Sequence, residues 1–104
     1  MATATLSKKG NTLTVRLECE IDHHTAKDIR ERIDRSLDSE RPGELILDFS
    51  KVSFMDSSGI GLIIGRVERA SSIGAAVTVT GASGMIRKLL SMSGIEKLKS
   101  LRIV

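Results

Sequence analysis

The spacing of apolar residues changes period along this chain, and that change limits the folds it can adopt. Residues 12–19 alternate strictly between polar and apolar side chains, the apolar ones being Leu13, Val15, Leu17 and Cys19. This alternation predicts a half-buried strand. Residues 23–38 then show a helical period, with apolar side chains on one face at Ala26, Ile29, Ile33 and Leu37. Asp22 stands immediately before this helix and is a good N-cap.

The same change of period recurs along the rest of the chain. The predicted order is strand 3–7, strand 12–19, helix 23–38, strand 45–49, helix 57–72, strand 75–80, helix 84–93 and strand 98–103. The apolar run in residues 45–49 predicts a strand covered on both faces. Gly10 and Asn11 can form a hairpin turn between the first two strands. Pro42, Gly74 and Gly94 are placed to end the three helices.

This order predicts an α/β fold with a mixed, mostly parallel sheet of four or five strands. Strand–helix–strand units join parallel neighbours through right-handed crossovers. In such units the loops that lead from strand to helix leave the sheet at one edge, where ligands and partners usually bind. We therefore expect three loops to converge, namely residues 20–25, 50–58 and 81–84.

Composition bounds the function further. The 104 residues fit one domain, residues 1–104, and the only aromatic side chains are Phe49 and Phe54. Base-stacking surfaces need aromatic faces, so we expect no direct contact with nucleic acid. The net charge of +3 comes from basic residues interleaved with acidic ones, as in residues 27–32, which is typical of a solvated helix face.

The single cysteine, Cys19, excludes an intramolecular disulfide. No signal peptide or membrane-length apolar run is present, which predicts a cytoplasmic protein with no membrane contact.

The segment from Phe54 to Gly61 carries the most unusual residues, Phe-Met-Asp-Ser-Ser-Gly-Ile-Gly. It leaves a strand region and opens the helix predicted from residue 57. One interpretation is structural: Asp56 or Ser57 caps the helix, and the glycines allow close packing. This interpretation is compatible with any function of the serines.

Other chemistries fit this segment less well. Gly59 and Gly61 begin a dinucleotide fingerprint, but the next glycine, Gly65, is one position late for it. The G-x-S-x-G elbow of a nucleophilic serine is absent. His23 and His24 are neighbours at a helix start, so their side chains point apart, which disfavours a shared metal. We therefore predict no catalytic residue and no metal site.

A phosphorylation switch is the remaining interpretation. A serine hydroxyl at an exposed helix N-terminus is accessible to a kinase, and its phosphate would add about −1.5 to −2 charges. The helix dipole and the free amides tolerate that charge locally. A partner surface shaped for a neutral serine beside Asp56 would not tolerate it, since like charges across an interface disfavour binding.

Three segments together resemble the bacterial anti-sigma-factor antagonists of the STAS domain family, and within it the sporulation members that oppose the anti-sigma-F factor. They are residues 20–26 (Glu-Ile-Asp-His-His-Thr-Ala), residues 53–61 around the two serines, and residues 87–94 at the end of the third helix. The resemblance extends over residues 13–98 and implies that the helices pack chiefly on one side of the sheet. Family members continue into a further helix after the last strand, whereas this sequence stops at Val104.

The resemblance implies partner switching. The unphosphorylated protein would bind the anti-sigma factor, a serine kinase, and make it release its sigma factor. That kinase would use ATP to phosphorylate Ser57, the first serine after the aspartate, and a PP2C-type phosphatase would reverse the step. The chain itself would be no enzyme and would hold no cofactor. The implied partner-binding residues are Asp22, His23, His24, Thr25, Asp56, Ser57, Ser58, Gly59 and Ile60.

Two alternatives stay open. The chain could be a STAS scaffold without a phosphorylation switch. It could also be a nucleotide-binding module that holds phosphate at the start of the Ser57 helix. The sigma factor involved, sigma F or another, also stays open.

Overall fold

The predicted order of elements is confirmed in the computed structural model, which describes residues 3–104. Within that range the elements are β1 (Ala4–Lys9), β2 (Thr12–Leu17), α1 (His23–Glu40), β3 (Glu44–Asp48), α2 (Ser57–Ser72), β4 (Ala76–Thr80), α3 (Gly84–Ser93), a 3₁₀ helix η1 (Ile95–Lys97) and β5 (Leu101–Ile103). The predicted single domain begins at residue 1, but Met1 and Ala2 lie outside the described residues.

The strands form one five-stranded sheet in the order β1-β2-β3-β4-β5. β1 is antiparallel to β2, whereas β2 to β5 are parallel to one another. Gly10 occupies the first central position of the tight turn between β1 and β2. This position requires a positive φ, and the φ of Gly10 is +60°. The mixed, mostly parallel sheet predicted from the sequence is therefore confirmed.

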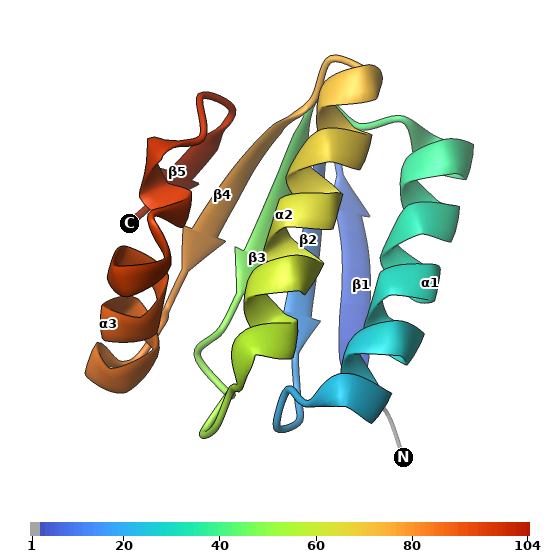
Figure 1. Ribbon diagram of the computed structural model, residues 1–104. Helices are drawn as coiled ribbons and strands as arrows, with labels where there is room; N and C mark the ends of the chain where they lie inside the picture. The colour runs from blue at the N-terminus through green and yellow to red at the C-terminus, as the bar shows by residue number, and fades with distance from the viewer. Residues whose placement is uncertain (1–2) are drawn as a thin grey trace.

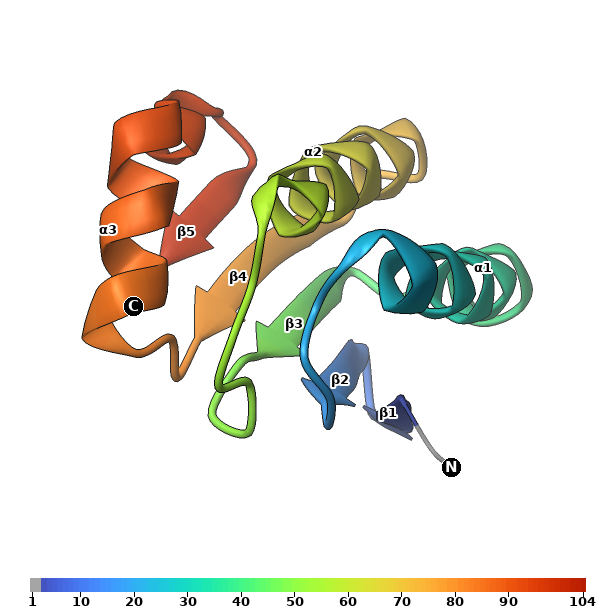
Figure 2. The same cartoon turned by 60° about the horizontal axis from the view of Figure 1, so that its bottom comes forward.

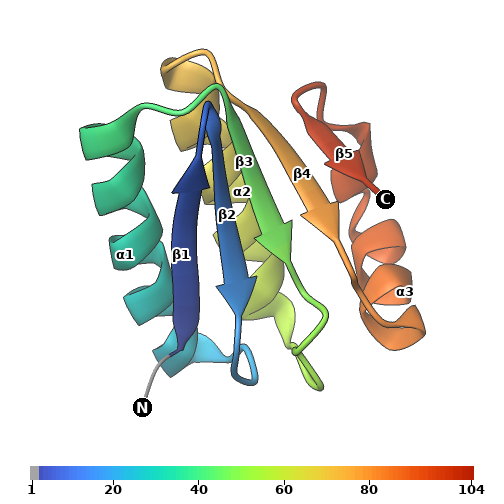
Figure 3. The ribbon, with the colours of Figure 1, turned by 180° about the vertical axis from the view of Figure 1, so that it is seen from behind.

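Within residues 3–104, the three α-helices pack on the same face of this sheet, and no α-helix covers the other face (Figures 1 and 3). The buried residues of neighbouring strands stand in rows beneath the helices. One row runs Leu13, Leu45, Val77 and Leu101, each paired with the next across the sheet. The apolar stripe of α1 (Ile29, Ile33 and Leu37) is fully buried on this face. Burying each such side chain contributes about 1.5–3 kcal/mol.

The prediction that residues 45–49 form a strand covered on both faces was wrong. In β3, Leu45 and Leu47 are fully buried, but Ile46 is only half-buried. Its side chain stands on the face without helices, between Thr14 of β2 and Thr78 of β4. A run of apolar letters does not reveal how many layers cover a sheet, and here one layer does.

Three strands are shorter than predicted, β4 only by one residue because it begins at Ala76. β2 ends at Leu17 instead of residue 19. Glu18 N still donates to Thr3 O at 2.9 Å, and the chain turns toward α1 after that bond. The last strand begins at Leu101 instead of residue 98, because residues 95–97 form a 3₁₀ turn in which Leu98 N donates to Ile95 O at 3.1 Å. None of the helices in residues 3–104 is long and apolar enough to cross a membrane.

Candidate functional site

The three loops that lead from strand to helix converge at one edge of the sheet, as predicted (Figure 2). A backbone bridge joins the first two loops: Ile21 N donates to Phe54 O at 2.9 Å, and Asp56 N donates to Ile21 O at 3.1 Å. The third loop packs against the second, because a Cβ on Gly81 would lie 2.9 Å from Ser50 N. We call this edge the helix-start edge. It brings together segments that are about 30 residues apart in the sequence.

At the start of α1, Asp22 forms a complete capping box with Thr25. The Asp22 carboxylate accepts hydrogen bonds from the backbone N–H of His24 at 2.9 Å and of Thr25 at 3.0 Å. In return, the backbone N–H of Asp22 donates to the Thr25 hydroxyl at 3.0 Å. The hydrogen bond from the Thr25 amide, aided by that from His24, lowers the pKa of Asp22 below its usual range. Asp22 is therefore a charged cap at neutral pH, as the sequence predicted.

At the start of α2, Asp56 is the cap and Ser57 is the first helical residue. The Asp56 carboxylate accepts from the backbone N–H of Ser58 at 2.8 Å. Val52 and Met55 are buried and hold the preceding loop against the core. The Ser57 side chain is exposed, whereas Ser58 is only partly exposed. Of the two caps that the sequence allowed here, the structure selects Asp56.

Gly59 differs from the other predicted site residues because it is buried. A Cβ at this position would overlap the Sδ and Cγ atoms of Met55. The absence of a side chain thus lets the first turn of α2 lie against Met55, which sets the position of Ser57 two residues earlier. Any contribution of Gly59 to partner binding passes through the shape of this loop.

The remaining predicted residues surround the two caps. His23 and His24 are exposed, and their ring centroids lie 5.5 Å apart in an edge-on arrangement. The expectation that these neighbouring side chains point apart was therefore wrong. Thr25 and Ile60 are partly buried. Within residues 3–104, no group of three or more His, Cys, Asp or Glu side chains is arranged to hold a metal ion.

The sequence reasoning missed Phe54 as a surface residue. Its side chain is 46% exposed in the loop before α2, whereas Phe49, the other aromatic residue, is fully buried. A single exposed apolar side chain does not by itself mark a contact surface, but Phe54 stands three residues before Ser57 in the same loop. The sequence does place Phe54 in the loop before the helix at residue 57, between the apolar residues Val52 and Met55, and not in a strand.

A pocket of about 430 Å³ between the first halves of α1 and α2 was also missed. Its lining includes basic side chains of α1 and small or apolar side chains of α2, chiefly Lys27, Arg30, Ser58, Gly61 and Leu62. The interleaved charges of residues 27–32 predicted a solvated face. The i, i+3 spacing places Lys27 and Arg30 on one side of α1, but no local signal in the sequence shows that this side faces α2.

This fold and its helix-start edge define a STAS domain: the family model of the STAS domain matches residues 3–102. The anti-sigma F factor antagonist of Paenibacillus polymyxa is 35% identical over 86 residues, which cover 83% of this chain and 74% of that protein. The chain therefore belongs to the STAS domain family, among its anti-sigma-factor antagonists.

Two solved structures of the anti-sigma factor antagonist SpoIIAA show the same architecture. The unphosphorylated form matches with a TM-score of 0.75 at 26% identity, over 97% of this chain and 86% of that one. The phosphorylated form, described as a Bacillus cell fate determinant, matches with a TM-score of 0.74 at 28% identity, over 97% and 90% of the two chains. These matches confirm the resemblance inferred from the sequence and the packing of the helices on one side of the sheet.

Proposed function

We propose that this chain is a partner-switching antagonist of an anti-sigma factor. Its unphosphorylated form binds the anti-sigma factor through the helix-start edge and causes release of the sigma factor. Phosphorylation of Ser57 by the same anti-sigma factor, acting as a serine kinase, ends this binding. The proposal is supported by the relationship to SpoIIAA, which has been solved in both a phosphorylated and an unphosphorylated form.

The observation that carries the proposal is the position of Ser57. Its side chain is exposed at the first position of α2, in a loop held in place by the Ile21–Met55 bridge. A kinase can reach a hydroxyl there without unfolding the domain. The N-terminal amides and the dipole of α2 stabilise an added phosphate, so the modified domain stays folded.

The surroundings of Ser57 explain how a phosphate would end binding. The neighbouring surface combines the exposed Phe54 with the carboxylates of Asp22 and Asp56. A phosphate adds about −1.5 to −2 charges beside these two cap carboxylates. Like-charge contact across an interface costs several kcal/mol, which corresponds to a loss of affinity of roughly 100- to 1,000-fold.

In this cycle the chain acts as a binding protein, not as an enzyme. The partner kinase supplies and consumes ATP, so the chain needs no cofactor of its own. A PP2C-type phosphatase restores the unphosphorylated form. Because the sigma factor and its regulators act on transcription, the proposed place of action is the cytoplasm. The similarity to the Paenibacillus anti-sigma F factor antagonist supports a role in sporulation.

Intact-mass analysis after incubation with ATP and the candidate anti-sigma kinase of the same genome tests the proposal. We expect the addition of one phosphate to the wild-type chain and to Ser58→Ala, and none to Ser57→Ala. Ser58→Ala is the matched control because it changes the adjacent hydroxyl of the same helix turn. Phosphate uptake by Ser57→Ala equal to that of wild type would overturn the assignment of Ser57.

Two further variants separate partner contact from helix capping. Ser57→Asp should weaken binding of the anti-sigma factor, measured by calorimetry, but less than phosphate does because it adds a single charge. Asp22→Asn keeps a capping side chain. If Asp22 contacts the partner, this variant loses phosphorylation although it still folds, as a cooperative melting transition would show. Retained phosphorylation would limit Asp22 to its capping role.

A further inference from the structure

We propose that the groove between α3 and β5, which we call the α3–β5 groove, binds an extended acidic segment of a protein partner. The segment adds to the sheet beside β5 as a further strand. This inference does not depend on phosphorylation of Ser57, because no residue of the loop before α2 lines the groove.

The outer edge of β5 forms one wall of the α3–β5 groove. β5 is the last strand of the sheet, and within residues 3–104 no strand lies beyond it (Figure 3). All three residues of β5 line the groove, and α3 lines it with Arg87, Lys88 and Leu90 among others. The groove has a volume of about 710 Å³, which lies within the range of ligand-binding clefts. It therefore has room for a bound segment along β5.

The backbone of β5 presents hydrogen-bonding groups to this groove. Ser100 O and Val104 N each form a hydrogen bond with β4 at 2.9 Å. Because successive residues of a strand turn their backbone groups to opposite sides, those of Leu101 and Ile103 face outward. Leu101 N donates to Leu98 O at 3.2 Å, but within residues 3–104 no hydrogen bond pairs the N–H or C=O of Ile103. Such an unpaired edge binds extended peptides through main-chain hydrogen bonds.

The charges around the groove select an acidic segment. Residues 84–104 carry five cationic side chains and a single carboxylate side chain. Lys88 and Arg102 line the groove, and within residues 3–104 neither forms an ion pair within 4 Å. Arg87 Nη1 donates to Val104 O at 3.2 Å, which uses one of its five donors. Carboxylates of a partner are therefore attracted to this groove, whereas a basic partner is repelled.

The two faces of β5 predict the residue pattern of the segment. Arg102 is exposed on the face of the sheet without helices, where it pairs with Thr78 of β4. Leu101 and Ile103 face the helices and are buried and half-buried, respectively. A strand added beside β5 alternates in the same way. We therefore expect apolar side chains on the helix side and carboxylates opposite Arg102, because opposite charges across neighbouring strands attract.

The free backbone edge favours a peptide over other anions. A nucleic acid or an anionic membrane would satisfy the cations of the groove equally well. Neither offers a peptide backbone whose N–H and C=O groups can pair with Ile103. Charge and edge together therefore point to an extended acidic chain.

Titration of the ¹⁵N-labelled full chain with the acetylated and amidated peptide Val-Glu-Val-Glu-Val-Glu, followed by NMR, tests the proposal. We expect saturable shifts centred on residues 87–90 and 101–104, with slower hydrogen exchange of the Ile103 amide. Arg102→Gln should weaken binding up to about fivefold, the effect of one charge pair across neighbouring strands. Lys99→Gln removes the same charge from an exposed lysine outside the groove and should bind as wild type does.

Backbone-modified peptides test the strand pairing separately from the charge. N-methylation of the three valines blocks one edge of the peptide, and N-methylation of the three glutamates blocks the other. One of these peptides should bind about tenfold more weakly or worse, because it loses its hydrogen bonds to β5 but keeps every charge. Equal affinity of both for the groove would overturn the proposal. So would a thymidine oligonucleotide that binds as tightly as the unmodified peptide, or unchanged exchange of the Ile103 amide at saturation.

Discussion

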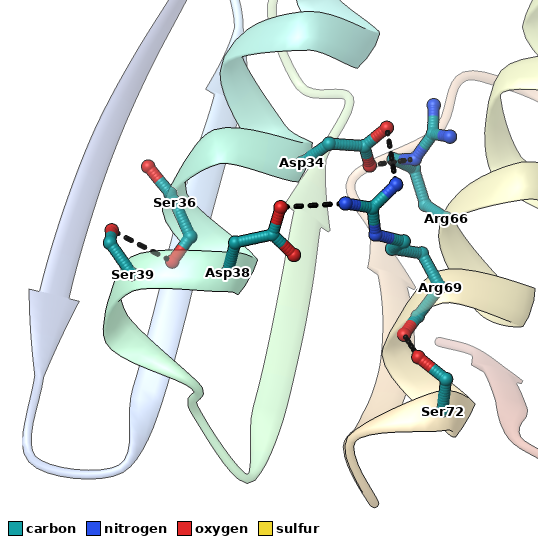
Figure 4. Close-up of polar contacts among 7 residues, drawn as sticks. All are labelled: Asp34, Ser36, Asp38, Ser39, Arg66, Arg69 and Ser72. Atoms are coloured by element: carbon teal, nitrogen blue, oxygen red, sulfur yellow. Dashed lines mark hydrogen bonds and ion pairs between the residues drawn. The ribbon is translucent and has the colours of Figure 1, made fainter.

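Replacing Asp34 with alanine should lower the stability of this domain more than replacing any more exposed aspartate or glutamate. Asp34 of α1 and Arg66 of α2 form an ion pair between two helices that pack side by side on the sheet (Figure 4). The Arg66 side chain is 6% exposed and that of Asp34 is 17% exposed. In Asp34→Ala the guanidinium would remain buried without its counter-ion.

The expected magnitude follows from this burial. Breaking a buried ion pair by removing one partner costs about 3–5 kcal/mol, because the remaining charge is uncompensated. A domain of this size has a free energy of unfolding of roughly 5–15 kcal/mol in total. One kcal/mol shifts the melting temperature by about 4–8 °C, so Asp34→Ala should lower it by at least about 12 °C.

The same network contains a matched control. Arg69 Nη2 and Asp38 Oδ2 are 2.6 Å apart, but their side chains are 45% and 57% exposed. An exposed pair contributes at most about 1 kcal/mol, so Asp38→Ala should have a small effect. The double variant Asp34→Leu/Arg66→Met replaces the buried pair with apolar side chains and should recover most of the lost stability. Urea unfolding followed by circular dichroism measures all three. If Asp34→Ala costs no more than Asp38→Ala, the argument from burial is wrong.

Two further predictions concern the starts of α1 and α2. Folding lowers the pKa of the Asp22 carboxyl group, so the charged carboxylate stabilises the folded state. This stabilisation is complete above the pKa of an ordinary aspartate, about 3.9, and is lost as the pH falls through the lowered pKa of the folded state. Asp22→Asn should therefore flatten the acid side of the stability profile in urea unfolding at successive pH values, and an unchanged slope would contradict this. Gly59→Ala should lower the stability of the domain by about 1–3 kcal/mol, because the added Cβ overlaps Met55 and the better helix propensity of alanine offsets only part of this cost. Gly61→Ala, where the Cβ meets nothing within 4 Å, should raise the stability by up to about 1 kcal/mol. Equal effects at the two glycines, measured by the same unfolding assay, would refute the packing argument.

Much of the candidate site could be read from the sequence because its interactions are local. Asp22 and Asp56 cap helices through amides two or three residues ahead, so both caps follow from short segments. The convergence of the loops follows from the order of strands and helices alone. Ser57 as the phosphate acceptor came from the family resemblance and stays a prediction.

What the sequence determined by itself, then, was the order of elements, the parallel sheet and the capped helix starts, because periodicity and capping act over a few residues. Three contacts become visible only in the folded molecule: Ile46 faces the side of the sheet without helices, Ile21 pairs with Met55, and Asp34 contacts Arg66. The structure also places Lys27 and Arg30, which are both exposed, among the residues that line the pocket between α1 and α2. These contacts join residues about 30 or more positions apart, or depend on which layer covers a surface. Such pairings are set by the packing of whole elements and leave no local pattern in the chain.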